Sequence, residues 1–367
     1  MSGDWVPGIA GNFPLHQAVV EAMPKGAIVL SAETYGTSSW SQTAKVLATL
    51  PDGSPKTYFL KCSSGPSART MTEGEYHSAL AIREVVSDFV PKPAAWGEYH
   101  DGQTSVYFYL ADFHDMDLRA PPDPKRFTAK VAELHSKSKS PTGMFGFYTP
   151  TVLGIFERTV KWETSWAQCF TNQLQDVIRY DNETNGYWPE FDAACKQLIE
   201  AVIPRLLGAL QSEGRSIEPV LIHGSLWEQN MGVDMETGDT VVFDAGCTYA
   251  HNEMEFGTWR GSWAYHFKKP VYMRFYHNHI KPSAPKHEWD DRNRLYSLHP
   301  NLNDSAGHPG SISRSIAYND MLFLCEKYAP LESLEKYNPE NDIRATGAYS
   351  QDTTHTSRNH IRALGLK

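Results

Sequence analysis

The chain has 367 residues, with 34 Lys and Arg against 43 Asp and Glu and a formal net charge of -9. At the usual ~100 to 200 residues per folding unit this length predicts two or three units, so a lone small module is excluded. Hydrophobic residues make up 41% of the sequence, which is typical of a globular protein. The acidic balance argues against nucleic acid as a partner, because phosphate binding needs a basic surface.

Membrane insertion and export are also disfavoured. No stretch reaches the ~18 consecutive apolar residues of a spanning helix, and residues 1–5 lack the basic and apolar parts of a signal peptide. We therefore expect a cytoplasmic protein with no membrane partner. The five cysteines lie far apart without a Cys-x-x-Cys pair, which favours reduced, buried thiols.

The N-terminal third of the sequence is predicted to be rich in strands. Residues 1–26 are interrupted by Pro and Gly and are expected to be irregular. Two hairpins are predicted after them, one from residues 44–50 and 57–61 and one from residues 94–99 and 105–110. Residues 70–89 between the hairpins have the apolar spacing of a helix. Residues 27–112 are therefore expected to form one lobe.

A mainly helical lobe is predicted over residues 113–330, so the fold class is α+β. Helical spacing covers residues 127–138, 155–178 and 190–212, and it resumes from 253 to about 328. Two short strands, 219–222 and 240–243, interrupt these helices, and each is followed at once by polar residues. The polar tail, residues 331–367, has few apolar positions and is expected to be partly disordered.

The sharpest motif begins at His223 and reads His-Gly-Ser-Leu-Trp-Glu-Gln-Asn, with Asp244 fourteen positions after Asn230. Kinase-like phosphotransferases use a His-x-Asp-x4-Asn loop and a later Asp. The loop Asp orients or deprotonates the acceptor, while Asn and the later Asp hold magnesium. Amide and carboxylate oxygens suit that hard cation. Because Ser225 occupies the acidic position, the metal-binding half is predicted to be present and the base absent.

Lys61 ends a predicted strand, where a kinase-like lobe has the lysine that binds the α and β phosphates. Its partner would be a carboxylate on the next helix, either Glu73 or Glu75. Helical spacing aligns Glu75 with the apolar positions Ala79 and Ile82, so we favour Glu75. Taken alone, Lys61 would be read as a solvated strand-end lysine, and its place relative to the other motifs reverses that interpretation.

Other motifs give weaker signals or argue against other classes of protein. Gly36, Thr37 and Ser38 precede the first hairpin and could cover phosphates, but with one glycine a plain surface loop is an equal interpretation. The sequence has no Gly-x4-Gly-Lys-Ser/Thr motif and no His-Glu-x-x-His motif. Ser225 also lacks the Gly-x-Ser-x-Gly context of a serine hydrolase.

Together these residues resemble the fructosamine 3-kinases, also called ketosamine or protein-ribulosamine 3-kinases, relatives of the aminoglycoside and choline kinases. The resemblance spans about residues 30–327 and rests on residues 58–61, 71–76, 90–93, 221–230, 243–255 and 275–277. It implies a bilobal protein-kinase-like fold with ATP and Mg²⁺ in the cleft. It also implies phosphorylation of the sugar O3 of a ketosamine, on a small molecule or on a protein.

The resemblance implies a role for each matched residue. Lys61 and Glu75 would form the phosphate-binding ion pair, and Asn230 and Asp244 would be the metal ligands. The hinge that contacts adenine would be Ala111, Asp112 and Phe113. The residues beside the sugar would be Trp227, His251, Glu253 and Glu255.

Ser225 is the departure from the family pattern, which has Asp there. General-base catalysis contributes ~10² to 10⁴-fold, so its loss should cripple turnover without abolishing nucleotide binding. The sequence leaves open a natural pseudokinase, a chain with residual or altered activity, and a deliberate replacement. A related kinase acting on a different alcohol is a further alternative.

Overall fold

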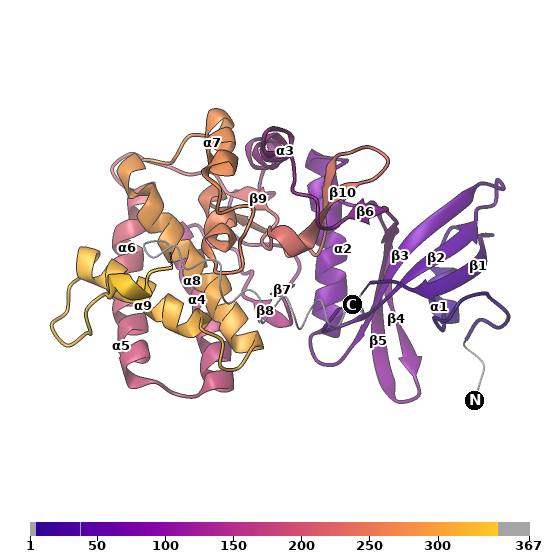
Figure 1. Ribbon diagram of the computed structural model, residues 1–367, viewed down its shortest axis with the longest axis horizontal. Helices are drawn as coiled ribbons and strands as arrows, with labels where there is room; N and C mark the ends of the chain where they lie inside the picture. Colours follow the sequence, from indigo (N-terminus) through magenta and orange to yellow (C-terminus); the bar gives the residue numbers. More distant parts are fainter. Residues whose placement is uncertain (1–4, 37, 344–367) are drawn as a thin grey trace.

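A computed structural model gives the structure of the chain, and it describes residues 5–36 and 38–343. A β-rich part and a helical part lie side by side, with helix α2 between them (Figure 1). This arrangement confirms the predicted α+β class. The β-rich part is an antiparallel sheet in the order β1-β2-β3-β5-β4. Its strands are β1 (Ile28–Thr34), β2 (Gln42–Thr49), β3 (Pro55–Ser64), β4 (Pro93–Asp101) and β5 (Thr104–Asp112).

The N-terminal segment is more ordered than its sequence predicts. It includes the short helix α1 (Gln17–Glu21), and Phe13, Leu15, Val19 and Met23 are buried against the sheet. The frequent Pro and Gly residues mark its turns, but its apolar side chains still complete the core of this lobe. Both predicted hairpins are confirmed, as β2 with β3 and β4 with β5.

Helix α2 (Ala68–Val85) contacts both parts of the molecule. Its buried face packs against the sheet strands β3 and β5 and against β7 (Thr151–Leu153) of the helical part. Gly74 lies at the contact with β7, where an added Cβ would be 2.8 Å from the carbonyl oxygen of Pro150. A glycine in the middle of this helix therefore permits a close backbone approach.

The helical part contains α3 (Pro124–Lys137), α4 (Trp166–Asn185), α5 (Pro189–Gln197), α6 (Ile203–Leu206), α7 (Pro270–His279), α8 (Trp289–Gly307) and α9 (Ser313–Tyr328). The predicted helix from residue 155 is wrong at its start. Residues there form a hairpin of β7 and β8 (Phe156–Arg158), with Gly154 in a left-handed conformation at the turn. None of the helices among the described residues is long and apolar enough to cross a membrane.

Short strand pairs interrupt the helices as predicted. The expected strands are β9 (Val220–Ile222) and β11 (Thr240–Val242), and the sequence missed their partners β12 (Thr248–Ala250) and β10 (Met231–Asp234). Strand β6 (Met116–Asp117) pairs with β10 directly after the sheet ends, which links the two lobes.

Residues 331–343, the first part of the predicted polar tail, pack on the helical part. Leu334 is buried in the helical core, and Asp342 pairs with Arg294 of α8 at 2.8 Å. The remainder of the predicted tail lies outside the described residues.

Candidate active site

Lys61 joins the two lobes through two carboxylates. It lies on β3, and its Nζ is 2.8 Å from an oxygen of Glu75 on α2 and 2.6 Å from an oxygen of Asp244. Burial alone would lower the pKa of Lys61, but the charges of Asp244 and Glu75 outweigh it and raise that pKa above its usual value. Lys61 is therefore a permanent cation at the contact between the lobes.

Strand pairing brings Asn230 and Asp244 together. Asn230 directly precedes β10 and Asp244 follows β11, and the register aligns Met231 with Val242. The backbone N–H of Phe243 donates to the carbonyl oxygen of Asn230 at 2.9 Å. Asp244 has φ +55°, a strained backbone for a non-glycine residue, and such strain is concentrated at functional sites.

Ser225 keeps one of the contacts that a carboxylate would make. The Asn230 side-chain amide donates from Nδ2 to the Ser225 carbonyl oxygen at 3.0 Å and to its Oγ at 2.9 Å. Both residues are buried, so this pair of bonds fixes the amide and leaves Asn230 Oδ1 as an acceptor. A serine here thus orients the predicted metal ligand, but it has no carboxylate with which to take a proton.

The residues present fit a magnesium ion held mainly by phosphates. Asn230 offers Oδ1, and the Asp244 side chain is 47% exposed, with Lys61 bonded to one of its carboxylate oxygens. No group of three or more His, Cys, Asp or Glu among the described residues could hold a metal by itself. Mg²⁺ characteristically takes one or two protein ligands and completes its shell with substrate phosphates and water.

Three of the four residues expected beside the sugar are buried and form hydrogen bonds within the protein. Glu255 is buried and accepts the backbone N–H groups of His223, at 2.6 Å, and Gly224, at 3.0 Å. It therefore positions the start of the catalytic loop, residues 223–230, from within the protein. Both of its carboxylate oxygens are thus engaged by the backbone of this loop.

Glu253 and His251 are likewise used internally. Glu253 binds Arg292 through two bonds of 2.7 and 3.1 Å, and His251 bonds Tyr296 and Ser283, both at 2.8 Å. Burial lowers the pKa of His251 to about 4, so the ring is neutral. Sequence spacing identifies such residues but cannot tell which way they face.

Trp227 is the remaining member of this set, and it is half-buried. Its ring meets that of Trp263 edge to face, with 6.5 Å between centroids. Trp263 lies outside the motifs named above, so no pattern pointed to it. Of the four expected sugar contacts, Trp227 is the one that keeps an exposed surface.

The expected hinge lies where β5 leaves the sheet. Ala111 is buried within the ladder, and Asp112 pairs with Lys56 at 2.8 Å. The backbone N–H of Phe113 donates to the carbonyl oxygen of Thr57 at 3.1 Å. These contacts fix the course of the chain between the lobes.

The expected phosphate-covering loop folds towards this hinge. Tyr35 meets the ring of Phe113 edge to face at 4.9 Å, directly before Gly36, which has φ +73°. Ser38 accepts a hydrogen bond from the backbone of Trp40 at 3.2 Å and faces solvent. Thr37 lies outside the described residues. The loop and the hinge are therefore neighbours, as a nucleotide site between them requires.

Sequence reasoning missed Arg158, which is buried on β8. Its Nη2 donates to the Gly246 carbonyl oxygen and, at 3.1 Å, to Thr151 Oγ1, whereas Nε and Nη1 have no partner among the described residues. A Cβ at Gly224 would lie 3.1 Å from Nη2, and one at Gly246 only 2.8 Å. The guanidinium therefore lies between the catalytic loop and the loop after Asp244. Burial lowers the pKa of Arg158 to about 10, which leaves it charged.

A two-lobed α+β fold with a buried Lys–Glu pair, and with an Asn and an Asp at the ends of paired strands, is the arrangement that the sequence predicts for a kinase-like phosphotransferase. The family model described as fructosamine kinase matches residues 35–316. The chain belongs to the fructosamine kinase family.

Curated relatives agree with this assignment. A chloroplastic protein-ribulosamine 3-kinase from Oryza sativa subsp. indica is 29% identical over 67% of this chain, and mouse ketosamine-3-kinase is 26% identical over 72% of it. The match covers 66% of the length of the rice relative and 86% of the mouse one. The chain thus spans just under two thirds of the rice protein.

Solved structures share the fold. The structure assigned to a fructosamine-3-kinase of Thermobifida fusca has a TM-score of 0.63 at 19% identity and covers 84% of this chain and 98% of its own. An aminoglycoside phosphotransferase in complex with AMP-PNP and hygromycin B has a TM-score of 0.52 at 16% identity and covers 83% of this chain and 95% of its own. At these identities the likeness establishes the fold.

Proposed function

We propose that the chain is an ATP-dependent kinase of the ketosamine 3-kinase type whose turnover is reduced by Ser225. Its acceptor would be the sugar O3 of a fructosamine or ribulosamine on an amine or a protein. The observation that carries the proposal is the bonding of Lys61 to both Glu75 and Asp244, since it joins three separate elements into one site. A chance cluster would not also have an Asn and an Asp at the ends of two paired strands.

Each residue has a distinct task in this proposal. Lys61 would bind the α and β phosphates once a nucleotide displaces Asp244 from it, and Glu75 would hold its ammonium in place. Asn230 and Asp244 would hold Mg²⁺, which neutralises charge on the phosphates when bound. Residues 111–113 would contact adenine. Catalysis would depend on positioning and charge, because Ser225 is too weak a base at neutral pH.

ADP formation with a ribulosamine or fructosamine acceptor tests the proposal. We expect slow turnover by the chain and ~10² to 10⁴-fold faster turnover by Ser225→Asp, the range that a general base contributes. Lys61→Met in the Ser225→Asp background is the matched control and should be inactive. If neither the unmodified chain nor Ser225→Asp formed ADP, the proposal that the chain is a kinase would be refuted.

Ser225 also favours a second candidate, a nucleotide-binding pseudokinase with a regulatory role. The serine preserves the bond that orients Asn230 while removing the base, so binding could persist without turnover. Calorimetry with ATP and Mg²⁺ beside a turnover assay separates the two. Clear phosphoryl transfer by the unmodified chain would exclude the pseudokinase.

A kinase acting on another alcohol is the remaining alternative, because related folds differ mainly in the acceptor groove. Turnover measured with a panel of acceptors distinguishes this alternative from the ketosamine kinase. Turnover of an aminoglycoside or choline beside inactivity on ketosamines would favour that alternative.

A further inference from the structure

One surface segment differs in charge from the rest of the molecule. Residues 265–287, here called the basic segment, contain no Asp or Glu, although the whole chain has 43 of them. The segment carries five Lys and Arg residues and four histidines. Its cations are Lys268, Lys269, Arg274, Lys281 and Lys286. An acidic protein thus has a stretch of sequence with five cations and no acid.

The basic segment is fixed to the catalytic loop at its start. One carboxylate oxygen of Glu228 accepts the backbone N–H groups of Tyr265, His266 and Phe267 at 2.9, 2.8 and 3.1 Å. Glu228 is buried and lies two residues before Asn230. The segment therefore begins beside the residues that would carry phosphoryl transfer.

The far end is fixed by the ion pair described above. Glu253 accepts the backbone N–H of Ser283 at 2.7 Å, and Arg292 donates to the carbonyl oxygens of Ser283 and Pro285, each at 2.9 Å. His251 also bonds Ser283 Oγ at 2.8 Å, so two of the residues expected beside the sugar, Glu253 and His251, hold this segment in place. Between the two ends lies α7, which packs on α3.

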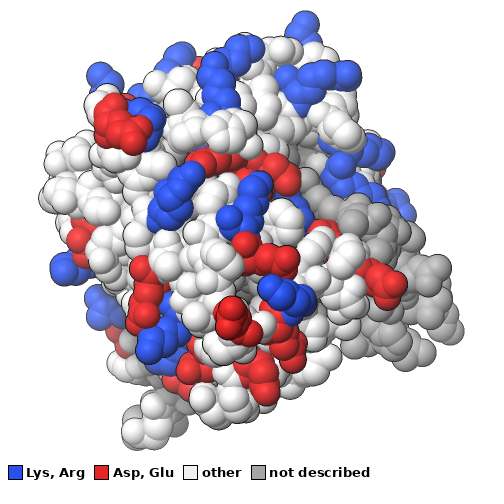
Figure 2. Space-filling model, turned by 90° about the vertical axis from the view of Figure 1, so that its left-hand side faces the viewer, with Lys and Arg blue, Asp and Glu red and all other residues white. Residues whose placement is uncertain are grey.

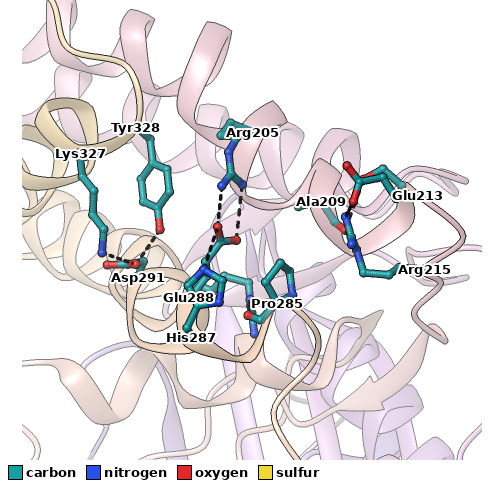
Figure 3. A network of polar contacts seen from close by, with 12 residues as sticks. Arg205, Ala209, Glu213, Arg215, Pro285, His287, Glu288, Asp291, Lys327 and Tyr328 are labelled. Carbon is teal, nitrogen blue, oxygen red and sulfur yellow. Dashed lines mark hydrogen bonds and ion pairs between the residues drawn. The ribbon is translucent and has the colours of Figure 1, made fainter.

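Four of the five cations of the segment are exposed. Lys269, Arg274, Lys281 and Lys286 are exposed, and in the part of the chain that the structure describes none of the four forms an ion pair. The first acid after the segment, Glu288, is buried and bonded to Arg205 at 2.6 Å (Figure 3). It is therefore occupied by another cation.

The surface view agrees with this charge distribution. Figure 2 shows the end of the helical part, where Lys and Arg predominate towards the top, the level at which α7 lies in Figure 1. Acidic and basic side chains mix lower down. Positive side chains thus outnumber negative ones towards the top of this face.

We propose that the basic segment docks an acidic protein acceptor, whose glycated amine lies among Asp and Glu side chains. This inference rests on the proposed function and names the kind of acceptor. Complementary charges would speed encounter and favour acidic surroundings over basic ones. A long polyanion such as a nucleic acid fits less well, because beyond the segment it would meet the acidic remainder of the chain.

Binding of labelled peptides to the full chain tests the docking surface without requiring turnover. The probes are two peptides with one ribose-modified lysine, flanked by glutamates or by lysines, and the same two peptides unmodified. Fluorescence anisotropy at 50 and 300 mM NaCl measures their Kd values. We expect the glutamate-flanked peptide to bind at least about tenfold more tightly at low salt, and this preference to shrink at high salt as screening increases.

Charge reversal identifies the surface. The test variant is Lys269→Glu, Arg274→Glu, Lys281→Glu and Lys286→Glu combined, and the control reverses four other exposed lysines, Lys25, Lys139, Lys196 and Lys336. The test variant should lose the preference, and the control should keep it. The four corresponding changes to Gln should lose part of it. Circular dichroism and thermal unfolding check that every variant is folded.

The outcomes separate this inference from the proposed function. Equal binding of both flanked peptides, or an equal loss in the control variant, would overturn the docking surface. Tighter binding of a single-stranded RNA of the same charge would overturn the choice of partner. If acidic peptides bind with or without the ketosamine, the docking surface is supported and the proposed acceptor chemistry fails.

Discussion

Replacing Glu255 should loosen the catalytic loop from inside the protein. Its carboxylate accepts from the backbone N–H groups of His223 and Gly224, at 2.6 and 3.0 Å, within a buried environment. Hydrogen bonds to a charged group contribute about 1.5 to 3 kcal/mol each. Glu255→Ala, which leaves both donors unsatisfied, should therefore cost about 3 to 6 kcal/mol, a large part of a typical folding free energy of 5 to 15 kcal/mol.

Glu255→Gln is the more informative variant, because it keeps the shape and one acceptor oxygen. Glu255→Gln should lower the free energy of unfolding by ~1.5 to 3 kcal/mol, half the effect of Glu255→Ala, because its amide NH₂ would face one of the two backbone N–H groups. Urea unfolding followed by tryptophan fluorescence gives the stability, and calorimetry gives the Kd of Mg²⁺–ATP. The exposed Glu340→Gln is the matched control, expected within about 0.5 kcal/mol of the parent chain.

The reasoning would be refuted if Glu255→Gln matched the parent chain in both stability and nucleotide affinity. A loss of affinity with unchanged stability would instead place Glu255 nearer to the ligand than the structure does.

Three further predictions concern other parts of the fold. Arg158→Met should weaken Mg²⁺-dependent ATP binding about tenfold, which corresponds to the smallest free energy expected for one hydrogen bond of a charged group. ATP binding without metal should change little, and calorimetry with and without Mg²⁺ measures both affinities. Gly74→Ala should lower the Tm, because overpacking against Pro150 costs about 1 to 3 kcal/mol and the gain in helix propensity is only ~1 kcal/mol. A higher Tm would contradict the close contact. Burial lowers the pKa of His299 from 6.5 to about 3, so between these pH values the unfolded chain binds a proton that the folded chain does not. The free energy of unfolding should therefore be about 2 kcal/mol lower at pH 5 than above pH 6.5. His299→Gln should remove this pH dependence, which urea unfolding measures.

Sequence reasoning reached those parts of the site whose positions depend on local spacing. Glu75 could be separated from Glu73 because a helix buries one face, and the structure places it 2.8 Å from Lys61. Asn230 and Asp244 could be paired because their spacing matches the His-x-Asp-x4-Asn loop and later Asp of kinase-like phosphotransferases. The register that joins them depends on β10, which is only four residues long and carries too little pattern to be recognised.

Features that depend on orientation or on distant partners could not be predicted in this way. Arg158 lies in a stretch whose spacing suggested a helix, and only the hairpin directs it towards Gly246. Glu253 and Glu255 are two residues apart and both buried, yet one contacts α8 and the other the catalytic loop. The two glutamates have the same residue type and lie in the same short motif, so only the tertiary structure shows that their partners differ.

The double attachment of α2 has a consequence for movement between the lobes. Thr70 donates to Glu157 at 2.6 Å, and Ser78 accepts the backbone N–H of Cys247 at 2.9 Å, so the helix is bonded to the larger lobe along much of its length. If the five-stranded sheet tilts to admit a ligand, we expect α2 to keep its position relative to the larger lobe. The boundary of motion then runs between β3 and α2, and the bonds of Lys61 to Glu75 and to Asp244 both cross it. The lengths of these two ion pairs would report how far the cleft has opened.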